Sequence, residues 1–194
     1  GDLLSYWPFD KGQGNAAREK TSGVLRSIRT PFHPMEWPQG PRDSSVRFDA
    51  YSTWIEAPSL TDGGAGGITV EAWVAVRAFP YQEDAAIVNQ HAIPNGFFMG
   101  LDTYGFWNFS LGVNGEWRSC ISPFPIPNFR WVHVAGTYDN NHIRIYLNGN
   151  RIAETHAPGN FTPASGTPLL VGKRNNSSTF VVFPLGIFNG LMDE

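Results

Sequence analysis

Residues 131–147 read WVHVAGTYDNNHIRIYL and contain two segments in which apolar and polar side chains alternate. In the second segment Ile143, Ile145 and Leu147 share one face, because successive side chains of a strand point to opposite sides. An Asn-Gly pair follows at 148–149 and predicts a type I′ hairpin turn, in which both central residues need a positive φ. The stretch therefore predicts antiparallel strands with one buried face.

The same alternation recurs along most of the chain, and no segment has a convincing helical pattern. Strands are predicted at 3–9, 46–49, 53–57, 68–76, 86–90, 97–102, 106–113, 116–121, 131–138, 142–147, 150–155, 169–172 and 185–193. Many short strands separated by turns are typical of an all-β fold, a two-sheet antiparallel jelly-roll sandwich. We expect residues 1–194 to form a single domain, which stands alone or is one module of a longer chain.

Two segments interrupt this pattern. Residues 10–45 are polar and rich in proline, and we predict a long loop with little regular structure, which is either functional or loosely ordered. Residues 63–67 (GGAGG) are predicted to be a flexible connector. They lack the Lys-Ser/Thr pair and the following helix of a phosphate-binding loop.

Composition limits the classes of partner. The formal net charge is −3 and no basic run is present, so the sequence lacks the positive footprint of a nucleic-acid-binding protein. No apolar stretch approaches the length of a membrane span. The one cysteine, Cys120, excludes an internal disulfide. Aromatic residues make up 14% of the chain, which suits a β architecture or a stacking surface.

A series of motifs, in order, resembles the laminin-G-like jelly-roll domains of the concanavalin A-like lectin/glucanase superfamily. Their order and spacing agree over nearly the whole chain. The matching stretches are LSYWPFD (4–10), VRFD (46–49) followed by WIE (54–56), ITVEAWV (68–74), WVHVAGTYD (131–139), YLNG (146–149), LVG (170–172) and FNGLMDE (188–194).

The resemblance implies a concanavalin A-like sandwich that is secreted, periplasmic or on the cell surface. It also implies a position beside glycoside hydrolases or on surface proteins. Two departures are visible: the loop at 23–45 is longer than usual, and the chain stops at Asp193-Glu194, where family members continue through a final strand. We therefore expect a fragment or module of a longer protein.

Catalytic motifs are missing. The glucanase branch of the superfamily carries its two carboxylates in the pattern E-x-D-x-x-E, and this spacing does not occur here. Glu83 and Asp84 are adjacent, so on a strand they would face opposite ways. There is no G-x-S-x-G elbow, and the histidines lack the spacing of zinc ligands. We predict that the chain is not an enzyme.

A structural calcium ion is compatible with the sequence. The resemblance points to a site that ties the start of the domain to its end, and the matching acids are Asp10, Asp49 and Asp193. Calcium takes six to eight oxygen ligands, many of them from loops, so it leaves little linear motif. The alternative is that these carboxylates only form hydrogen bonds in turns.

Sugar recognition needs an exposed aromatic ring with polar side chains nearby. Trp37 lies in the long loop, and Trp117 is followed directly by Arg118. Tyr104 and Phe106 lie at a predicted turn. These five residues are the candidate ligand contacts, and the alternative for each aromatic residue is packing in the core.

Three hypotheses follow. The first is a non-catalytic carbohydrate-binding accessory module that holds a neighbouring catalytic domain near a glycan or polysaccharide. It requires exposed aromatic residues next to polar groups. The second is a structural module that packs on an adjacent domain, which requires a broad apolar patch. The third is a glycosidase, which requires two carboxylates about 5–10 Å apart in a groove.

Overall fold

The computed structural model describes residues 2–60, 66–180 and 182–194, and all of its regular elements are strands. None of the described segments is a helix long and apolar enough to cross a membrane. The strands are β1 (Ala16–Arg18), β2 (Leu25–Arg29), β3 (Val46–Asp49), β4 (Trp54–Ala57), β5 (Ile68–Val76), β6 (Ala85–Ala92), β7 (Asn95–Leu101), β8 (Phe106–Val113), β9 (Glu116–Pro125), β10 (Val132–Tyr138), β11 (His142–Leu147), β12 (Asn150–His156), β13 (Leu169–Val171), β14 (Thr179–Phe180), β15 (Phe183–Pro184) and β16 (Asn189–Asp193).

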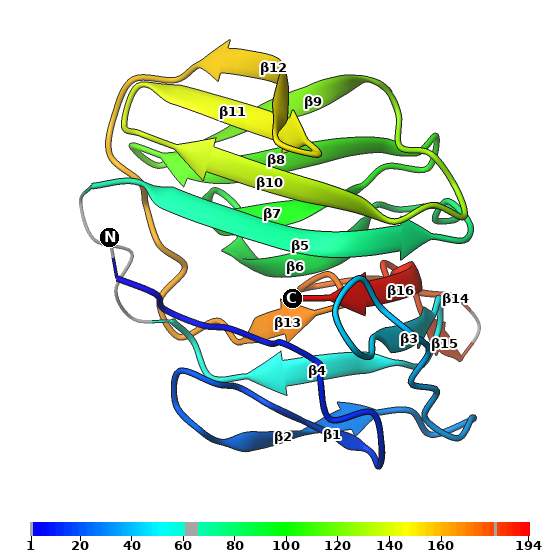
Figure 1. Cartoon of the computed structure of the whole chain (residues 1–194). Helices are drawn as coiled ribbons and strands as arrows, with labels where there is room; N and C mark the ends of the chain where they lie inside the picture. Colours follow the sequence, from blue (N-terminus) through cyan, green and yellow to red (C-terminus); the bar gives the residue numbers. More distant parts are fainter. Residues whose placement is uncertain (1, 61–65, 181) are drawn as a thin grey trace.

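Two antiparallel sheets form the layers of the sandwich (Figure 1). The large sheet has the strand order β1-β2-β4-β13-β6-β7-β8-β9, and the small sheet has the order β12-β11-β10-β5-β16-β3. A separate hairpin, β14-β15, lies at one end of the sandwich. This arrangement confirms the predicted jelly-roll sandwich, and the strands expected at 46–49, 68–76, 106–113 and 142–147 have the predicted bounds.

Alternation along the strands builds the core between the sheets. Phe109 of the large sheet is fully buried, and so are Val134 and Ile145 of the small sheet. The sheets approach closely at Gly136 of β10, where a Cβ atom would lie 2.3 Å from the Phe109 ring. A side chain at position 136 would therefore push the layers apart, which explains the glycine in an otherwise apolar strand.

The N-terminal part differs from the prediction. Residues 3–9 are not a strand, because Pro8 has no N–H to donate to a ladder; Trp7 and Phe9 are instead buried in the core. The loop predicted at 10–45 contains the short strands β1 and β2, which extend the large sheet beyond β4. Of the predicted glycine connector, residues 63–65 lie outside the described part of the chain.

Candidate functional site

The outer face of the large sheet carries a row of side chains that its register brings together. Phe98 of β7 pairs with Ser110 of β8, which pairs with Ser119 of β9. Their neighbours Met99 and Phe109 point the other way into the core. Because side chains alternate between the faces of a sheet, the row faces away from the small sheet.

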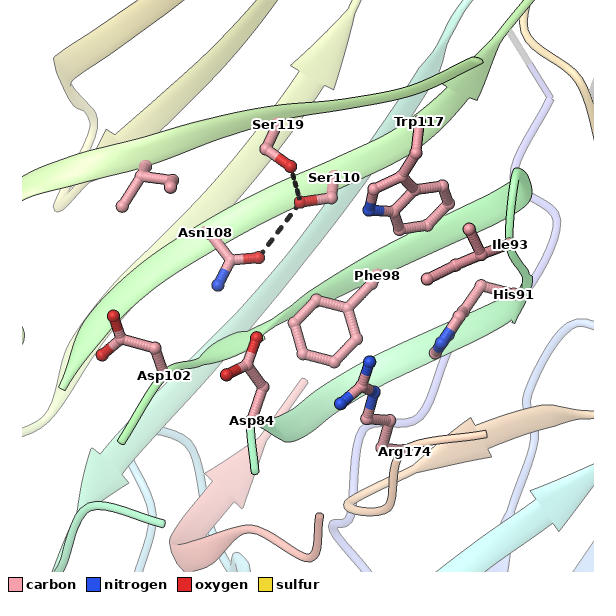
Figure 2. A pocket seen from close by; sticks show the side chains of 11 residues that line it. Asp84, His91, Ile93, Phe98, Asp102, Asn108, Ser110, Trp117, Ser119 and Arg174 are labelled. Atoms are coloured by element: carbon pink, nitrogen blue, oxygen red, sulfur yellow. Dashed lines mark hydrogen bonds between the residues drawn. The ribbon is translucent and has the colours of Figure 1, made fainter. Parts of the chain in front are cut away.

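A pocket of about 330 Å³ lies over this row, between β6, β7, β8 and β9 (Figure 2). Its lining changes in character from one end to the other. One end is aromatic and apolar, the centre combines the Phe98 ring with uncharged polar groups, and the opposite end is charged.

Trp117 and His91 form the aromatic end, together with Ile93 of the β6–β7 hairpin (Figure 2). The two ring centroids are 5.6 Å apart. The position beside Trp117 on β8 is Gly112, and the position beside His91 on β7 is Gly96. Neither ring therefore meets a side chain at its paired position. Trp117 remains half-buried, so part of its ring is available for stacking.

His91 is held as a neutral ring. It is buried, its Nδ1 lies 2.8 Å from Asn89 Oδ1, and its backbone N–H donates to Asn175 Oδ1. Burial, with the nearby Arg174 guanidinium, lowers the pKa of His91 to about 4. At neutral pH His91 is therefore an uncharged ring that packs against Trp117.

Beside the Phe98 ring, the centre of the pocket carries hydrogen-bonding side chains. Ser110 Oγ is hydrogen-bonded to Ser119 Oγ at 2.7 Å and to Asn108 Oδ1 at 3.2 Å. No described residue accepts a hydrogen bond from the Asn108 amide nitrogen. These side chains therefore have donors and acceptors that face the pocket and are not used within the described part of the chain.

Asp84, Asp102 and Arg174 form the charged end (Figure 2). Ala85 pairs with Leu101, so Asp84 and Asp102 occupy the next positions, opposite one another, at the end of the β6–β7 ladder. Burial raises the pKa of Asp84; Arg174 opposes this effect, and Asp102 and Glu83 add to it.

Arg174 comes from a distant loop and is only partly satisfied. Its guanidinium lies 5.9 Å from the Phe98 ring centroid, and its Nη1 is 3.7 Å from Glu83 Oε2. Its Nε is buried without a hydrogen-bond partner among the described residues. Buried donors are rarely left unpaired, so this end of the pocket has capacity for a polar group that the chain does not supply.

The predicted ligand residues do not all converge. Trp117 lines the pocket, whereas the following residue, Arg118, faces away from it and pairs with Glu116. Tyr104 is 75% exposed at the β7–β8 turn, where its N–H donates to Asp102 Oδ1. The structure places neither Tyr104 nor Arg118 in the pocket lining.

Two further predicted aromatic residues also lie outside the pocket. Phe106 begins β8 and is half-buried, and its N–H donates to Asp102 Oδ1. Trp37 is not among the residues that line the pocket and packs against the core. Its Nε1 donates to the Gly14 carbonyl at 2.8 Å.

The three predicted calcium ligands do not meet at one point. Asp49 pairs with Asn189 at one end of the β3–β16 ladder, and Asp193 lies at the other end. Four residues of strand separate these ends by about 13 Å. Asp10 is exposed and has no described carboxylate contact. Among the described residues there is no group of three or more acidic, histidine or cysteine side chains suited to a metal ion.

Asp49 and Asp193 differ in their capacity for a cation. Asp49 Oδ1 accepts hydrogen bonds from the backbone N–H groups of Tyr51, Ser52 and Thr53, as expected for a turn carboxylate. Asp193 is fully buried, and its Oδ1 has no hydrogen-bond partner among the described residues. Burial raises its pKa to about 6. Of these two carboxylates, Asp193 is the one with an oxygen that no described residue satisfies.

Most residues of the pocket were not identified from the sequence. A signal is present for Asn108 and Ser110, because these polar residues alternate with strongly apolar residues on their strand. Arg174 follows β13, which is distant in sequence, and no local pattern indicates that it faces this sheet.

Comparison with solved structures shows the same fold at low sequence identity. Domain 4 of AbnA, a GH43 extracellular arabinanase from Geobacillus stearothermophilus solved with arabinotriose, is 16% identical with a TM-score of 0.68; the match covers 98% of this chain and 91% of that one. The binding domain of Paraclostridial Mosquitocidal Protein 1 is 11% identical with a TM-score of 0.72. That of botulinum neurotoxin serotype D is 14% identical with a TM-score of 0.63.

Both toxin matches cover 98% of this chain, which spans 47% of each toxin structure. No curated protein sequence matches the chain. The family described as the concanavalin A-like lectin/glucanases superfamily matches residues 49–194, about three quarters of the sequence. Together with the two-sheet sandwich, this match shows that the chain belongs to the concanavalin A-like lectin/glucanases superfamily.

Proposed function

We propose that the chain is a non-catalytic carbohydrate-binding module and that the pocket on the large sheet is its glycan site. One observation carries the proposal: a half-buried Trp117 borders a row of polar groups that still have hydrogen-bonding capacity. A sugar ring has an apolar face that stacks on an aromatic side chain and hydroxyl groups that bind polar side chains.

The comparisons support this proposal. The arabinanase domain that shares this fold was solved with arabinotriose, and the two toxin structures are binding domains. An accessory role beside a secreted glycoside hydrolase is part of the proposal and accords with the arabinanase. A secreted, periplasmic or cell-surface location would place the module near polysaccharide.

The test is a glycan array probed with the wild-type chain and with Trp117→Ala, followed by calorimetric titration of the bound glycans and of arabinotriose. We expect Trp117→Ala to lower affinity about 30-fold, the effect of removing a stacking anchor of about 2 kcal/mol. The matched control is Trp73→Ala. Trp73 is also half-buried, but on the outer face of the small sheet, where its ring is 5.3 Å from His133.

The outcomes separate the hypotheses. Binding that is lost in Trp117→Ala and kept in Trp73→Ala supports the proposed site. Binding that both variants retain would place the glycan elsewhere. An array without any signal for the folded wild-type chain would overturn the proposal and favour a module that contacts an adjacent domain.

Glycoside hydrolysis is a second candidate, because Asp84 and Asp102 line the same pocket. Two opposed carboxylates, one with a raised pKa, are the groups that this reaction needs. The test is release of reducing ends from the glycans that bind. Cleavage that disappears in Asp84→Asn would establish an enzyme, whereas binding without cleavage supports the non-catalytic module.

A structural calcium ion remains a proposal, and the buried, unpartnered oxygen of Asp193 supports it. A bound cation would stabilise the ionised carboxylate that burial disfavours. We expect millimolar calcium to raise the melting temperature relative to EDTA. At a calcium concentration of about ten times Kd, the free energy of unfolding should increase by about 1.4 kcal/mol. Asp193→Asn should abolish the calcium effect. Asp10→Asn, at an exposed position, tests separately whether Asp10 contributes to binding the ion. A calcium effect that persists in Asp193→Asn would place the ion elsewhere.

A further inference from the structure

Four aromatic rings from three distant segments meet on the surface, away from the large-sheet pocket. The Phe183 ring centroid lies 5.9 Å from that of Phe32 and 5.8 Å from that of Tyr51, and Tyr51 lies 5.7 Å from His33. We call these four residues the aromatic cluster. Phe32 is 61% exposed, Phe183 40% and Tyr51 37%. Exposed apolar side chains gathered into one patch indicate a contact surface.

A second pocket, of about 220 Å³, adjoins the aromatic cluster and shares His33 and Tyr51 with it. His33 Nε2 lies 2.7 Å from the Tyr51 hydroxyl, so the two side chains hold each other in place. Glu36 and Arg47 line the pocket and form an ion pair at 2.6 Å, and Asn189 contributes an amide that has no described hydrogen-bond partner.

The pocket opens on the outer face of the small sheet. Val46 and Phe48 of β3 point into the core, so Arg47 between them points outward. The loop that contains Phe32 and His33 lies along this edge of the sheet. This loop is part of the proline-rich segment that the sequence predicts to be either functional or loosely ordered.

We infer that the second pocket and the aromatic cluster form a second carbohydrate-binding site on the opposite face of the sandwich. The class of ligand rests on the proposed function. A protein segment with apolar side chains is disfavoured, because it would remove water from the Glu36–Arg47 ion pair without replacing its hydrogen bonds. A sugar ring can stack on the cluster and bind these polar groups through its hydroxyls.

The size of the pocket restricts what it holds. At about 220 Å³ it is smaller than the 300–1,000 Å³ that is usual for ligand pockets, so we assign to it a single ring of a glycan. The two sites face in different directions, so one module can bridge two glycan chains. On a dense glycan surface the wild-type chain should then bind more tightly than either single-site variant.

The experiment compares the wild-type chain with four single variants and three double variants on one glycan array, with folding checked by circular dichroism. Phe183→Ala and Tyr51→Ala remove the aromatic cluster, and Trp117→Ala removes the stacking residue of the first site. The matched control is Phe180→Ala, because Phe180 is also exposed, at 50%, on the paired strand, but its ring contacts that of Tyr81.

We expect Trp117→Ala to retain binding to a subset of the glycans. The double variants Trp117→Ala/Phe183→Ala and Trp117→Ala/Tyr51→Ala should bind this subset with an affinity that is lower by about tenfold or more. Trp117→Ala/Phe180→Ala should keep it. A blank Trp117→Ala array, or a subset unaffected by Phe183→Ala and Tyr51→Ala, overturns the second site and leaves the first intact. A blank wild-type array overturns both. Loss in Phe183→Ala without any effect of Trp117→Ala supports the second site and overturns the first.

Discussion

Both outer faces of the sandwich carry a tryptophan packed against a histidine, and the pair on the large sheet lines the pocket described above. On the large sheet Trp117 and His91 are 5.6 Å apart, and on the small sheet Trp73 and His133 are 5.3 Å apart. His91 is buried beside the pocket, whereas His133 is half-exposed with its Nε2 3.6 Å from Glu71 Oε2.

The charged groups on the two faces differ in a further respect. On the small sheet, Arg144 pairs with Asp139 and Glu154, and Glu154 also pairs with Arg151, so the charges satisfy one another. On the large sheet, Arg174 Nε has no described partner. Because a polar group without a partner gains most from a ligand, this difference supports the large-sheet pocket as the site proposed for glycan binding.

The largest expected effect is a pH dependence of the free energy of unfolding that we assign to His91 and not to His133. The folded-state pKa of His91 is about 4, below the unfolded value of about 6.5, so the fold favours neutral His91. Its contribution to stability is present above pH 6.5 and is lost as the pH falls toward 4. We expect a loss of about 2–3 kcal/mol at about pH 4.5, measured by urea unfolding.

Two variants test the assignment to His91. His91→Gln should lose less stability than wild type between about pH 7 and pH 4.5. His133→Gln, on the small sheet, should keep the wild-type difference because His91 is still present. An unchanged pH dependence in His91→Gln would contradict the buried neutral ring.

The second prediction concerns the carboxylates of the two faces. Asp102→Asn keeps an oxygen for the Tyr104 N–H and the Phe106 N–H but removes the charge from the pocket. We expect glycan affinity to fall about tenfold, the loss of one charge-assisted hydrogen bond. The matched control is Asp139→Asn on the small sheet, with unchanged affinity in titration calorimetry. Equal losses of glycan affinity in both variants would show that Asp102 has no specific role in binding.

The smallest effect is expected from the small-sheet ion pairs. Arg144→Ala removes the bonds to Asp139 and Glu154, and exposed ion pairs contribute little to stability. We expect a slight drop in melting temperature at low ionic strength that disappears at high salt, with glycan binding intact. A large drop that persists in high salt would show that this network is structural.

Sequence reasoning located most strands because their apolar residues alternate, as in β5 and β11. It missed β1 and β2, because each has only one buried side chain, too few to give an alternating pattern. These side chains, Ala17 and Ile28, are buried because the large sheet extends beyond β4. It also assigned a strand to residues 3–9, where core contacts of Trp7 and Phe9 replace ladder hydrogen bonds.

The site could be predicted only in part. Trp117 was identified as an aromatic residue beside polar neighbours, but Arg118 was included although strand alternation turns it to the opposite face. Asp49 and Asp193 matched a family position in sequence, and the β3–β16 register holds them at opposite ends of the ladder.

The sequence by itself determined the all-β class, the Asn-Gly hairpin, the buried face of each long strand and the family, because these depend on local periodicity and on ordered motifs. Only the tertiary structure decided which polar groups meet. Arg174 reaches Asp84 across about 90 residues, and Phe183 reaches Phe32 across about 150. Such contacts arise from sheet order and loop packing, and no spacing along a chain encodes them locally.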